Sequence, residues 1–388
     1  MRDDPSPSRG GAVLCVVGAR PNFMKMAPIL RAFAAHVPHI PALLVHTGQH
    51  YDAVMSDRLF ADLQLPEPDI NLAVGSGSHA VQTAEVMQRF EPLIDAHAPT
   101  SVLVVGDVNS TLACSLVAVK RGVPVVHVEA GLRSFDRTMP EEINRVLTDQ
   151  ISDVLYTSER GAEMNLLREG IAAERIRFVG NVMIDSLLAN RRFAVAPAEA
   201  LGRAGFDGAL ANGPFGVVTM HRPANVDDPR VLRTLLEVLG DIGTRLPILF
   251  PVHPRTRSAI ENLGGLPARA QHVVTMLPPL GYLEMLGLLA EAKLVLTDSG
   301  GIQEEATALG VPCLTLRDNT ERPITVSEGT NTLVGRDPGA IARGVDEILA
   351  NGGKGGRIPE GWDGKAAERI AVDLATFLAS PQPTGAHK

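Results

Sequence analysis

The 388-residue sequence contains only three cysteines, Cys15, Cys114 and Cys313, and each lies within an apolar run. They have no CxxC spacing and are too few for a disulfide framework, so we expect small buried residues in a reducing compartment. The N-terminal stretch MRDDPSPSRGG is polar and lacks the apolar segment of a signal peptide. No hydrophobic run approaches the length of a membrane span. These absences predict a cytoplasmic protein that does not cross a membrane.

Positive charge is also scarce. Lys and Arg number 36 against 44 Asp and Glu, which gives a formal net charge of −8. Nucleic-acid-binding proteins normally carry a basic face, so we expect no nucleic-acid partner. A local pocket can still be positive on an acidic protein, and anionic small ligands therefore remain possible. Aromatic residues make up only 4% of the chain, so the core must consist mainly of aliphatic side chains.

Several signatures of cofactor and metal sites are missing from the sequence. It contains no GxGxxG fingerprint of a dinucleotide site and no Walker P-loop. It also lacks an HExxH helix, a compact metal-ligand spacing and a GxSxG nucleophile turn. We therefore expect no nicotinamide, no other cofactor and no metal site.

Short apolar runs alternate with helix-like patterns through most of the chain, for example AVLCVVGAR (12–20) and SVLVVGD (101–107). These runs are continuously apolar, which is typical of parallel strands covered by helices on both faces. A stretch rich in Ala, Gly and Pro interrupts the pattern before it restarts. We predict an α/β protein with two Rossmann-like, doubly wound domains facing across a cleft. The predicted parts are a disordered tail (1–11), an N-terminal domain (12–189), a linker region (190–214), a C-terminal domain (215–363) and a helix (364–380) that packs back on the first domain.

Glycine and polar residues recur where the predicted strands end. In open α/β sheets, ligands bind in the crevice beyond the carboxyl ends of the strands. Both predicted domains carry such ends, so we expect a ligand between the two domains. The strand ends concerned are the segments 18–20, 48–50, 106–107, 129–131, 221–222, 253–255 and 298–301.

Three carboxylates are candidates for acid–base chemistry. Asp107 and Glu129 each follow a predicted buried strand, and Glu141 opens a helix at MPEEINR. Each also has an ordinary structural explanation, since Asp caps helices and first-turn Glu is stabilised by the helix dipole. Gathered at one mouth of the first domain they would repel, which raises the pKa of at least one. A cluster of carboxylates with different pKa values can supply both a base and an acid.

Cations and glycines at helix starts indicate an anion site. Arg20 and Lys25 lie around the start of the first predicted helix, where cations are unfavourable unless an anion offsets them. The alternative for Lys25 is a solvated helix face. TDSGGIQEE (297–305) places a glycine turn before a helix, which suits a phosphate held on backbone amides. His221 ends a strand of the second domain, although a lone His in an apolar run is more often a core residue.

The linked motifs then resemble a known family. Their order and spacing, from about residue 12 to residue 335, are similar to those of the non-hydrolysing UDP-N-acetylglucosamine 2-epimerases. The resemblance implies the GT-B-like architecture of two Rossmann domains, a homodimer, a UDP-sugar substrate and no metal or nicotinamide. The motifs are GxRPxxxKMAP, TxQH, GDxxS/TT, HVEAGLR, PEExNR, HRxxN, PVH, TDSGGIQEE and ERP.

The resemblance implies reversible conversion of UDP-GlcNAc to UDP-ManNAc, which supplies cell-surface polysaccharide synthesis. In the family's proposed mechanism, the C2 proton is removed, UDP leaves by anti elimination, and UDP re-adds to 2-acetamidoglucal with protonation of the opposite face. The matching catalytic residues are Asp107, Glu129, Glu141 and His221. Two different groups on opposite faces must remove and return the proton.

The same resemblance implies the substrate contacts. Ser299, Gly300 and Gly301 match the diphosphate turn, and Glu305 matches the ribose contact. Glu304 is expected to be structural. The other matching residues are Arg20 and Lys25 in the cleft, Arg322 as a further cation, Leu280 and Met285 around the uracil, and Gln49 and His50 at a second, activating site.

The sequence departs from the family at two motif positions, where Asn22 replaces a usual Glu and Ala224 replaces a frequent acidic residue. Either change could alter sugar preference. The alternatives are a 2-epimerase of another UDP-2-acetamido sugar, a hydrolysing 2-epimerase that releases UDP and ManNAc, a GT-B glycosyltransferase, and a catalytically silent nucleotide-sugar sensor.

Overall fold

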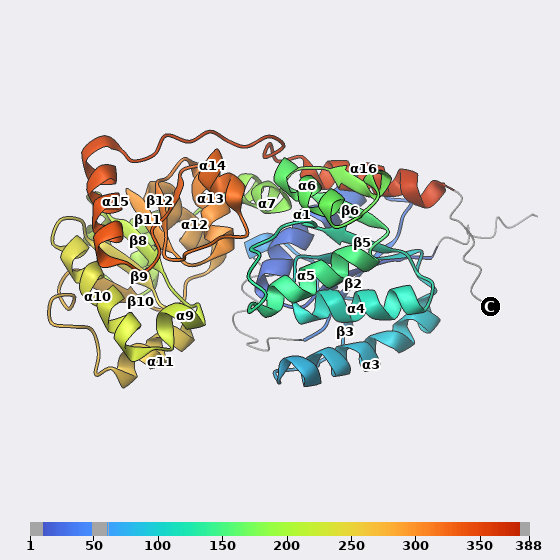
Figure 1. Ribbon diagram of the computed structural model, residues 1–388, viewed down its shortest axis with the longest axis horizontal. Coiled ribbons are helices and arrows are strands. Elements are labelled where there is room, and N and C mark those ends of the chain that lie inside the picture. Colours follow the sequence, from blue (N-terminus) through green and yellow to red (C-terminus); the bar gives the residue numbers. More distant parts are fainter. Residues whose placement is uncertain (1–10, 49–59, 61, 381–388) are drawn as a thin grey trace, which may run out of the picture. The chain divides into compact units, whose positions relative to one another are not determined.

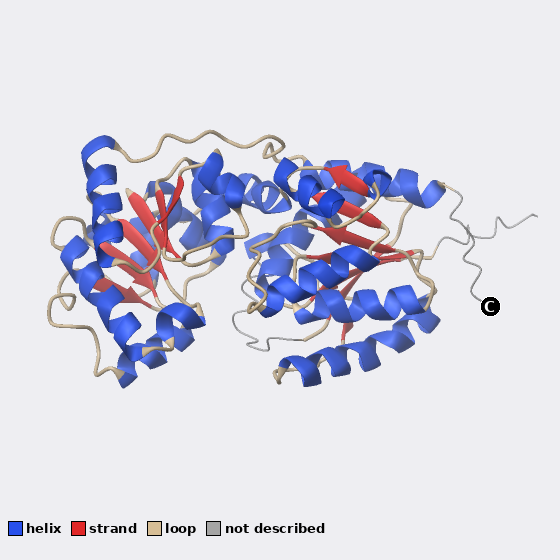
Figure 2. Ribbon diagram, in the orientation of Figure 1, coloured by secondary structure: helices blue, strands red, loops and turns tan. Residues whose placement is uncertain are grey.

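The computed structural model describes residues 11–48, 60 and 62–380 (Figure 1). The chain divides into two compact units. The first unit comprises Met1–Ser186 together with Asp363–Lys388, and the second comprises Leu187–Trp362. Each unit is an α/β structure with a parallel sheet between helices (Figure 2).

The first unit is built on a seven-stranded parallel sheet in the order β3-β2-β1-β4-β5-β6-β7. The strand order reverses between β1 and β4, and such a switch point is where doubly wound sheets bind ligands. The strands are β1 (Val13–Val17), β2 (Ala42–His46), β3 (Ile70–Asn71), β4 (Ser101–Val105), β5 (Val125–Val128), β6 (Val154–Thr157) and β7 (Ile176–Phe178).

Helices cover both faces of this sheet (Figure 2). The helix α16 returns from the C-terminal end of the chain and packs against α1. Asp185 on α7 accepts hydrogen bonds from the first amides of α16, at 3.2 Å from Ala366 N and 2.7 Å from Ala367 N. The helices are α1 (Arg20–His36), α3 (His79–His97), α4 (Asn109–Lys120), α5 (Pro140–Ile151), α6 (Arg160–Arg168), η1 (Ala173–Arg175), α7 (Val182–Asn190) and α16 (Ala366–Ala379).

The second unit repeats the same winding with six parallel strands in the order β10-β9-β8-β11-β12-β13. Its switch point lies between β8 and β11. The strands are β8 (Gly216–Thr219), β9 (Ile248–Pro251), β10 (Val274–Leu277), β11 (Leu294–Thr297), β12 (Cys313–Thr315) and β13 (Asn331–Leu333). The helices are η2 (Arg191–Phe193), α8 (Pro197–Arg203), η3 (Gly208–Ala211), α9 (Pro223–Val226), α10 (Pro229–Gly243), α11 (Pro254–Asn262), α12 (Tyr282–Glu291), α13 (Gly300–Leu309), α14 (Pro323–Ser327) and α15 (Pro338–Asn351).

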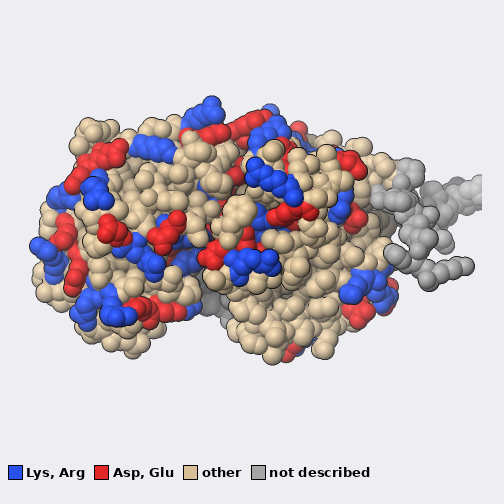
Figure 3. All heavy atoms as spheres, in the orientation of Figure 1, with Lys and Arg blue, Asp and Glu red and all other residues tan. Residues whose placement is uncertain are grey.

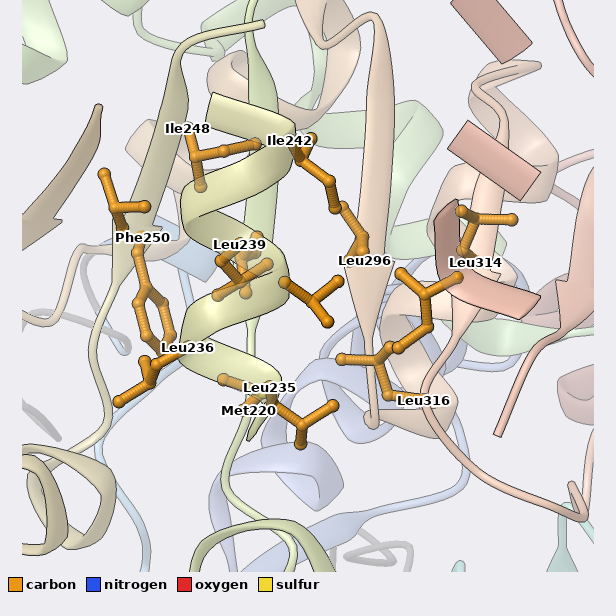
Figure 4. Close-up of a cluster of buried hydrophobic side chains, with 14 of the residues drawn as sticks. Met220, Leu235, Leu236, Leu239, Ile242, Ile248, Phe250, Leu296, Leu314 and Leu316 are labelled. Carbon is orange, nitrogen blue, oxygen red and sulfur yellow. The ribbon is translucent and has the colours of Figure 1, made fainter. Parts of the chain in front are cut away.

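The largest core cluster of the second unit shows why these residues fold this way. The helix α10 begins with Asp228 as its N-cap and Pro229 at its first position. Its leucines recur at spacings of three and four residues, so they form one apolar face that packs on the sheet. Figure 4 shows that face against side chains of the neighbouring strands. The core residues labelled there are Met220, Leu235, Leu236, Leu239, Ile242, Ile248, Phe250, Leu296, Leu314 and Leu316.

The prediction of two doubly wound, Rossmann-like domains is confirmed. Residues 190–214, predicted as a linker region, belong to the second unit. The helix α8 lies in this stretch, and its Leu201 is fully buried in a core cluster of the second unit. The helix has only seven residues, which is too short for its periodicity to stand out among Ala and Gly. Most of the predicted N-terminal tail, residues 1–10, lies outside the described residues.

In the described part of the chain, no helix combines the length and the apolar character that crossing a membrane requires. Acidic and basic side chains are intermixed over the face of the molecule shown in Figure 3.

Candidate active site

Gly106, which follows β4, leaves space for polar side chains at the switch point of the first unit. Gly106 has φ +69°, a conformation that L side chains rarely adopt. A Cβ there would lie 3.0 Å from Lys25 Nζ and 3.4 Å from Asn22 Nδ2. Asn22 is held in place because its Nδ2 donates to the Val105 carbonyl at 2.9 Å. The departure from the family at position 22 therefore lies inside this site.

Glu129 follows β5 with φ +70°, which is strained for a residue other than glycine. Lys25 Nζ donates to Glu129 Oε1 at 2.7 Å, and the two residues are only 5% and 6% exposed. Lys25 is thus not a solvated helix face, and the anion that offsets it in this structure is the Glu129 carboxylate. Strained, buried and charge-paired carboxylates at strand ends are typical of functional sites.

Asp107 is joined to the start of α5. Its carboxylate pairs with Arg145, and its carbonyl accepts from Asn144 Nδ2 at 3.0 Å. The Asp107 side chain remains 22% exposed, whereas the Arg145 side chain is 4% exposed. The N-cap of α4 is Val108, so the structural explanation of Asp107 as a helix cap is wrong.

Arg145 also pairs with Glu142, and this carboxylate organises the loop before α5. Glu142 accepts from the backbone N–H of Ser134 at 3.0 Å and of Phe135 at 2.9 Å. Glu141 precedes it in the first turn of α5 and is half-buried. One buried guanidinium therefore fixes Asp107 relative to the turn that carries Glu141.

The structure thus places all three predicted carboxylates at the carboxyl edge of one sheet. Two of them have a cation within ion-pair distance, Glu129 with Lys25 and Asp107 with Arg145. Each of these two carboxylates is therefore attracted to a nearby cation, in addition to the mutual repulsion that we expected from the sequence.

In the second unit, His221 follows β8 and is oriented by a buried carboxylate. Asp298 follows β11, is fully buried, and lies 3.1 Å from His221 Nδ1 through its Oδ1. Its Oδ2 accepts from the N–H groups of His221 at 3.0 Å and Arg222 at 2.9 Å, and from Asn225 Nδ2 at 3.0 Å. The side chain of His221 is 37% exposed, so part of it is open to solvent.

These donors also decide the charge of Asp298. Burial raises the pKa of this carboxyl, but the hydrogen bond and charge of His221 and the backbone N–H groups of Arg222 and His221 outweigh burial. The pKa of Asp298 therefore lies below its ordinary value. An ionised Asp298 can only accept, so His221 Nδ1 carries the hydrogen that it donates to this carboxylate.

The glycine turn after Asp298 opens a ten-residue helix. Ser299 is the N-cap of α13, and Gly300 and Gly301 form its first turn. A Cβ at Gly300 would lie 2.7 Å from Glu321 Oε1, so a side chain cannot be added there without displacing Glu321. Backbone amides at a helix start, free of side chains, suit a phosphate.

The charged residues around α13 are largely paired inside the unit. Arg322 Nε lies 2.8 Å from Glu304 Oε1, within ion-pair distance, and both residues are buried. Glu304 thus partly balances the positive charge of Arg322 inside the unit. Glu305 is also buried. The pKa of Tyr282 is raised, mainly because Tyr282 itself is buried and also because the Glu305 carboxylate lies near its hydroxyl.

The two residues predicted near the uracil lie at the start of α12. Leu280 is 8% exposed and Met285 packs against the same core cluster, so both side chains face the interior of the unit. The Met285 amide donates to the Gly281 carbonyl at 3.0 Å. Their contact with uracil stays a prediction.

Three predicted residues cannot be placed by their side chains. Gln49 and His50, the predicted second site, lie outside the described residues. Arg20 is placed only as the first residue of α1.

The sequence interpretation missed two residues that position the predicted catalysts. Arg145 follows Glu141 by four residues, a spacing that puts both on one helix face, and this signal could have found it. Asp298 had been noted only as the end of a strand, and no local pattern connects it with His221, 77 residues away.

Comparison with known proteins places this chain in a family. The family described as UDP-N-acetylglucosamine 2-epimerase matches residues 34–375. The chain belongs to the UDP-N-acetylglucosamine 2-epimerase family, and the resemblance seen in the sequence is confirmed.

Individual relatives cover nearly the whole chain. It is 42% identical to the UDP-N-acetylglucosamine 2-epimerase of Methanocaldococcus jannaschii, over 93% of this chain and 98% of that one. It is 43% identical to the UDP-2,3-diacetamido-2,3-dideoxy-D-glucuronate 2-epimerase of Pseudomonas aeruginosa, over 94% of this chain and 99% of that one. Among solved structures, the M. jannaschii UDP-GlcNAc 2-epimerase in complex with UDP-GlcNAc and UDP matches with a TM-score of 0.83 and 40% identity, over 94% and 99% of the two chains.

Proposed function

We propose that this protein reversibly epimerises UDP-N-acetylglucosamine to UDP-N-acetylmannosamine without releasing the sugar. The observation that carries the proposal is the division of chemistry between two switch points. The first unit presents Asp107, Glu129 and Glu141, and the second presents an oriented His221 beside a glycine turn. Membership of the family and the relatives named for this reaction support it.

In the first half of the proposed reaction, a proton leaves C2 and the C1–O bond breaks. In the second half, the C1–O bond forms again and C2 regains a proton. A carboxylate removes the C2 proton, the electron pair forms the C1–C2 double bond, and the C1–O bond breaks to release UDP within the site. The second half returns UDP to C1 and a proton to the opposite face of C2. Inversion requires two proton-transfer groups, and Asp107, Glu129 and Glu141 are the candidates.

His221 serves the leaving group in this proposal. Its Nδ1 donates to Asp298 and its side chain is partly exposed, so an imidazolium can form with Asp298 as its stabilising partner. Such a cation stabilises the charge that develops on the diphosphate as the C1–O bond breaks. The amides of Gly300 and Gly301 hold the diphosphate in the same proposal, and Glu305 accepts from the ribose hydroxyls.

The second candidate is a 2-epimerase of another UDP-2-acetamido sugar. The observation that favours it is the P. aeruginosa relative, which is named for a diacetamido glucuronate and is as similar as the relative named for UDP-GlcNAc. Both reactions use the same C2 proton and leaving group. The proposed product, an activated ManNAc donor, is of the kind that glycosyl-transfer steps of polysaccharide synthesis consume.

We also propose a homodimer formed through α3, α4 and α5. These helices pack side by side, and each leaves large apolar side chains exposed. Ile143 and Leu147, four residues apart on α5, are 41% and 46% exposed, while Val119 on α4 is 39% and Val81 on α3 is 53% exposed. Light scattering should find a dimer for the natural protein and a monomer for Leu147→Glu. A natural protein that is already monomeric would contradict this part.

Product analysis tests the proposed reaction. Purified protein is incubated with UDP-GlcNAc and, separately, with the diacetamido glucuronate nucleotide, and products are separated by chromatography. We expect UDP-ManNAc in a constant ratio to UDP-GlcNAc at equilibrium. Accumulation of free ManNAc and UDP identifies a hydrolysing enzyme instead, and turnover of the uronate alone identifies the second candidate.

A further inference from the structure

Behind the carboxylates of the first unit lies a network of four ionisable side chains, of which His127, Asp149 and Arg133 are buried and Glu169 is partly exposed. His127 Nδ1 is 2.7 Å from Asp149 Oδ1, and both side chains are fully buried. Asp149 Oδ2 is 2.7 Å from Arg133 Nη2, and Arg133 Nε donates to Glu169 Oε1 at 2.8 Å. The network contains two basic and two acidic groups, so it is neutral only if His127 is protonated.

Both ring nitrogens of His127 face hydrogen-bond acceptors. Nδ1 faces the Asp149 carboxylate, and Nε2 lies 2.8 Å from the Gly106 carbonyl oxygen. A carbonyl oxygen can only accept, so Nε2 must carry a hydrogen. Asp149 already accepts from the Gly131 N–H at 3.0 Å and lies 2.7 Å from Arg133 Nη2, so its neighbours on that side are donors and the carboxylate acts as an acceptor. Nδ1 must then also donate, which makes the ring an imidazolium.

His127 and Asp149 each hydrogen-bond to the backbone of a turn that follows a strand. Each of these two turns carries a proposed catalytic residue. His127 holds the carbonyl of Gly106, the residue before Asp107. Asp149 holds the amide of Gly131, two residues after Glu129. Gly131 has φ +78°, and a Cβ there would lie 2.5 Å from the Ala162 carbonyl oxygen, so this turn has little room to shift.

We propose that His127 is a positioning residue protonated on both ring nitrogens, which together with Asp149 fixes the spacing between the turns of Asp107 and Glu129. The proposal rests on the proposed function, because it assigns those two carboxylates to the reaction. The imidazolium also adds a buried positive charge below the site. The charged groups that face or adjoin it are Asp149 from α5, Arg133 from the loop before α5, Glu169 from the C-cap of α6, and the Lys25–Glu129 pair at the ends of α1 and β5.

Nitrogen NMR of the full-length protein with labelled histidine tests the protonation state directly. We expect both ring nitrogens of His127 to be of the protonated type at neutral pH, with slowly exchanging N–H groups. In Asp149→Asn the side-chain amide can donate to Nδ1, so His127 should become neutral while Nε2–H still binds Gly106. An unprotonated ring nitrogen in the natural protein at neutral pH would overturn the proposal.

Kinetics test the positioning role. We expect Asp149→Asn to lower kcat by about tenfold or more, with KM changed by less than about threefold, because the spacing of the carboxylates changes but the nucleotide contacts of the second unit do not. The matched control is Asp153→Asn, whose carboxylate accepts from Val125 N at 2.8 Å at the opposite end of β5. The control should keep the natural kcat.

The outcomes separate this inference from the proposed function. An unchanged kcat in Asp149→Asn overturns the positioning role even if the enzyme epimerises as proposed. A protein that does not epimerise, yet shows a doubly protonated His127, contradicts the proposed function and supports the protonation state. If Asp149→Asn does not fold, the NMR spectrum of the natural protein still decides the protonation state.

Discussion

The two sheets share one winding order but equip their switch points differently. Between β1 and β4, the first unit presents carboxylates that pair with Lys25 and Arg145, and Asp107 remains partly exposed. Between β8 and β11, the second unit buries its carboxylate, Asp298, and exposes a histidine. In the first unit a carboxylate stays partly exposed, whereas in the second a buried carboxylate orients a histidine.

Two buried carboxylates, one in each unit, differ in the direction in which their pKa is shifted. Asp185 in the first unit accepts from two backbone amides, and burial still raises its pKa to about 6. Asp298 in the second unit adds the hydrogen bond and charge of His221, and its pKa is lowered. Two amides do not offset the cost of burial, whereas a histidine partner in addition to backbone donors does.

The largest effect should come from removing the proton-transfer groups of the first unit. We expect Asp107→Asn and Glu141→Gln each to lower turnover by at least about two orders of magnitude, because an amide cannot accept or return a proton at C2. The measurement is kcat for UDP-GlcNAc. Glu163→Gln, a first-turn glutamate on α6, is the matched control and should stay within about twofold of the natural rate. Near-natural turnover in either active-site variant would remove that residue from the acid–base set.

Asp185 should give the next largest effect, on stability rather than on rate. Its folded pKa of about 6 lies above the ordinary value of 3.8, so the folded state binds the proton more tightly than the unfolded state. Stability from this group is therefore present at low pH and is lost as pH rises from about 4 to 6. The loss should be about 3 kcal/mol, the free-energy equivalent of this pKa difference.

Urea denaturation of the natural protein and of Asp185→Asn, followed by circular dichroism, measures this effect. The free energy of unfolding of the natural protein relative to the variant should fall between pH 4 and pH 6. A difference that does not change with pH would contradict the pKa assigned to Asp185.

Asp298 should show the opposite behaviour, because its folded pKa is lowered. It stays ionised at neutral pH, and its stabilising contribution is lost only as pH falls below the ordinary carboxyl range. We expect Asp298→Asn to lower kcat about ten- to a hundredfold, since the amide no longer fixes the tautomer of His221. The exposed neighbour Asp227, paired with Arg255, gives the control Asp227→Asn, whose kcat should not change. Equal rates for the two variants would argue that Asp298 does not act through His221.

The smallest effect concerns nucleotide binding in the second unit. In Gly300→Ala, the new Cβ would lie 2.7 Å from Glu321 Oε1, so Glu321 and the first turn of α13 must shift. We expect UDP to bind about tenfold more weakly by calorimetry, the cost of misplacing one or two amide hydrogen bonds. Gly202→Ala on α8 is the control, because a Cβ there meets no atom within 4 Å. UDP affinity that is the same for both variants would place the diphosphate elsewhere.

Much of this fold and site could be predicted from the sequence because the strands are buried on both faces. A run such as SVLVVGD marks both the strand and its carboxyl end, and so places Asp107 and Gly106 at the edge of the sheet. Glu129 and His221 were found in the same way. The family motifs then supplied the expected roles, which spacing alone could not have given.

The remainder depended on contacts between residues that are distant in the sequence. Lys25 meets Glu129 across 104 positions, and Asp298 meets His221 across 77. No local periodicity encodes such pairs, so Lys25 was expected to contact a phosphate and Asp298 received no role. The helix α8 was missed for a different reason, since seven residues rich in Ala and Gly leave almost no periodic signal.

The central claim is that carboxylates of the first unit exchange the C2 proton of an intact nucleotide sugar. NMR of the purified protein with UDP-GlcNAc in D2O tests it most directly. The account predicts deuterium at C2 in both UDP-GlcNAc and newly formed UDP-ManNAc, with no free ManNAc accumulating. Epimerised product that keeps its original C2 proton, or ManNAc released into solution, would contradict it.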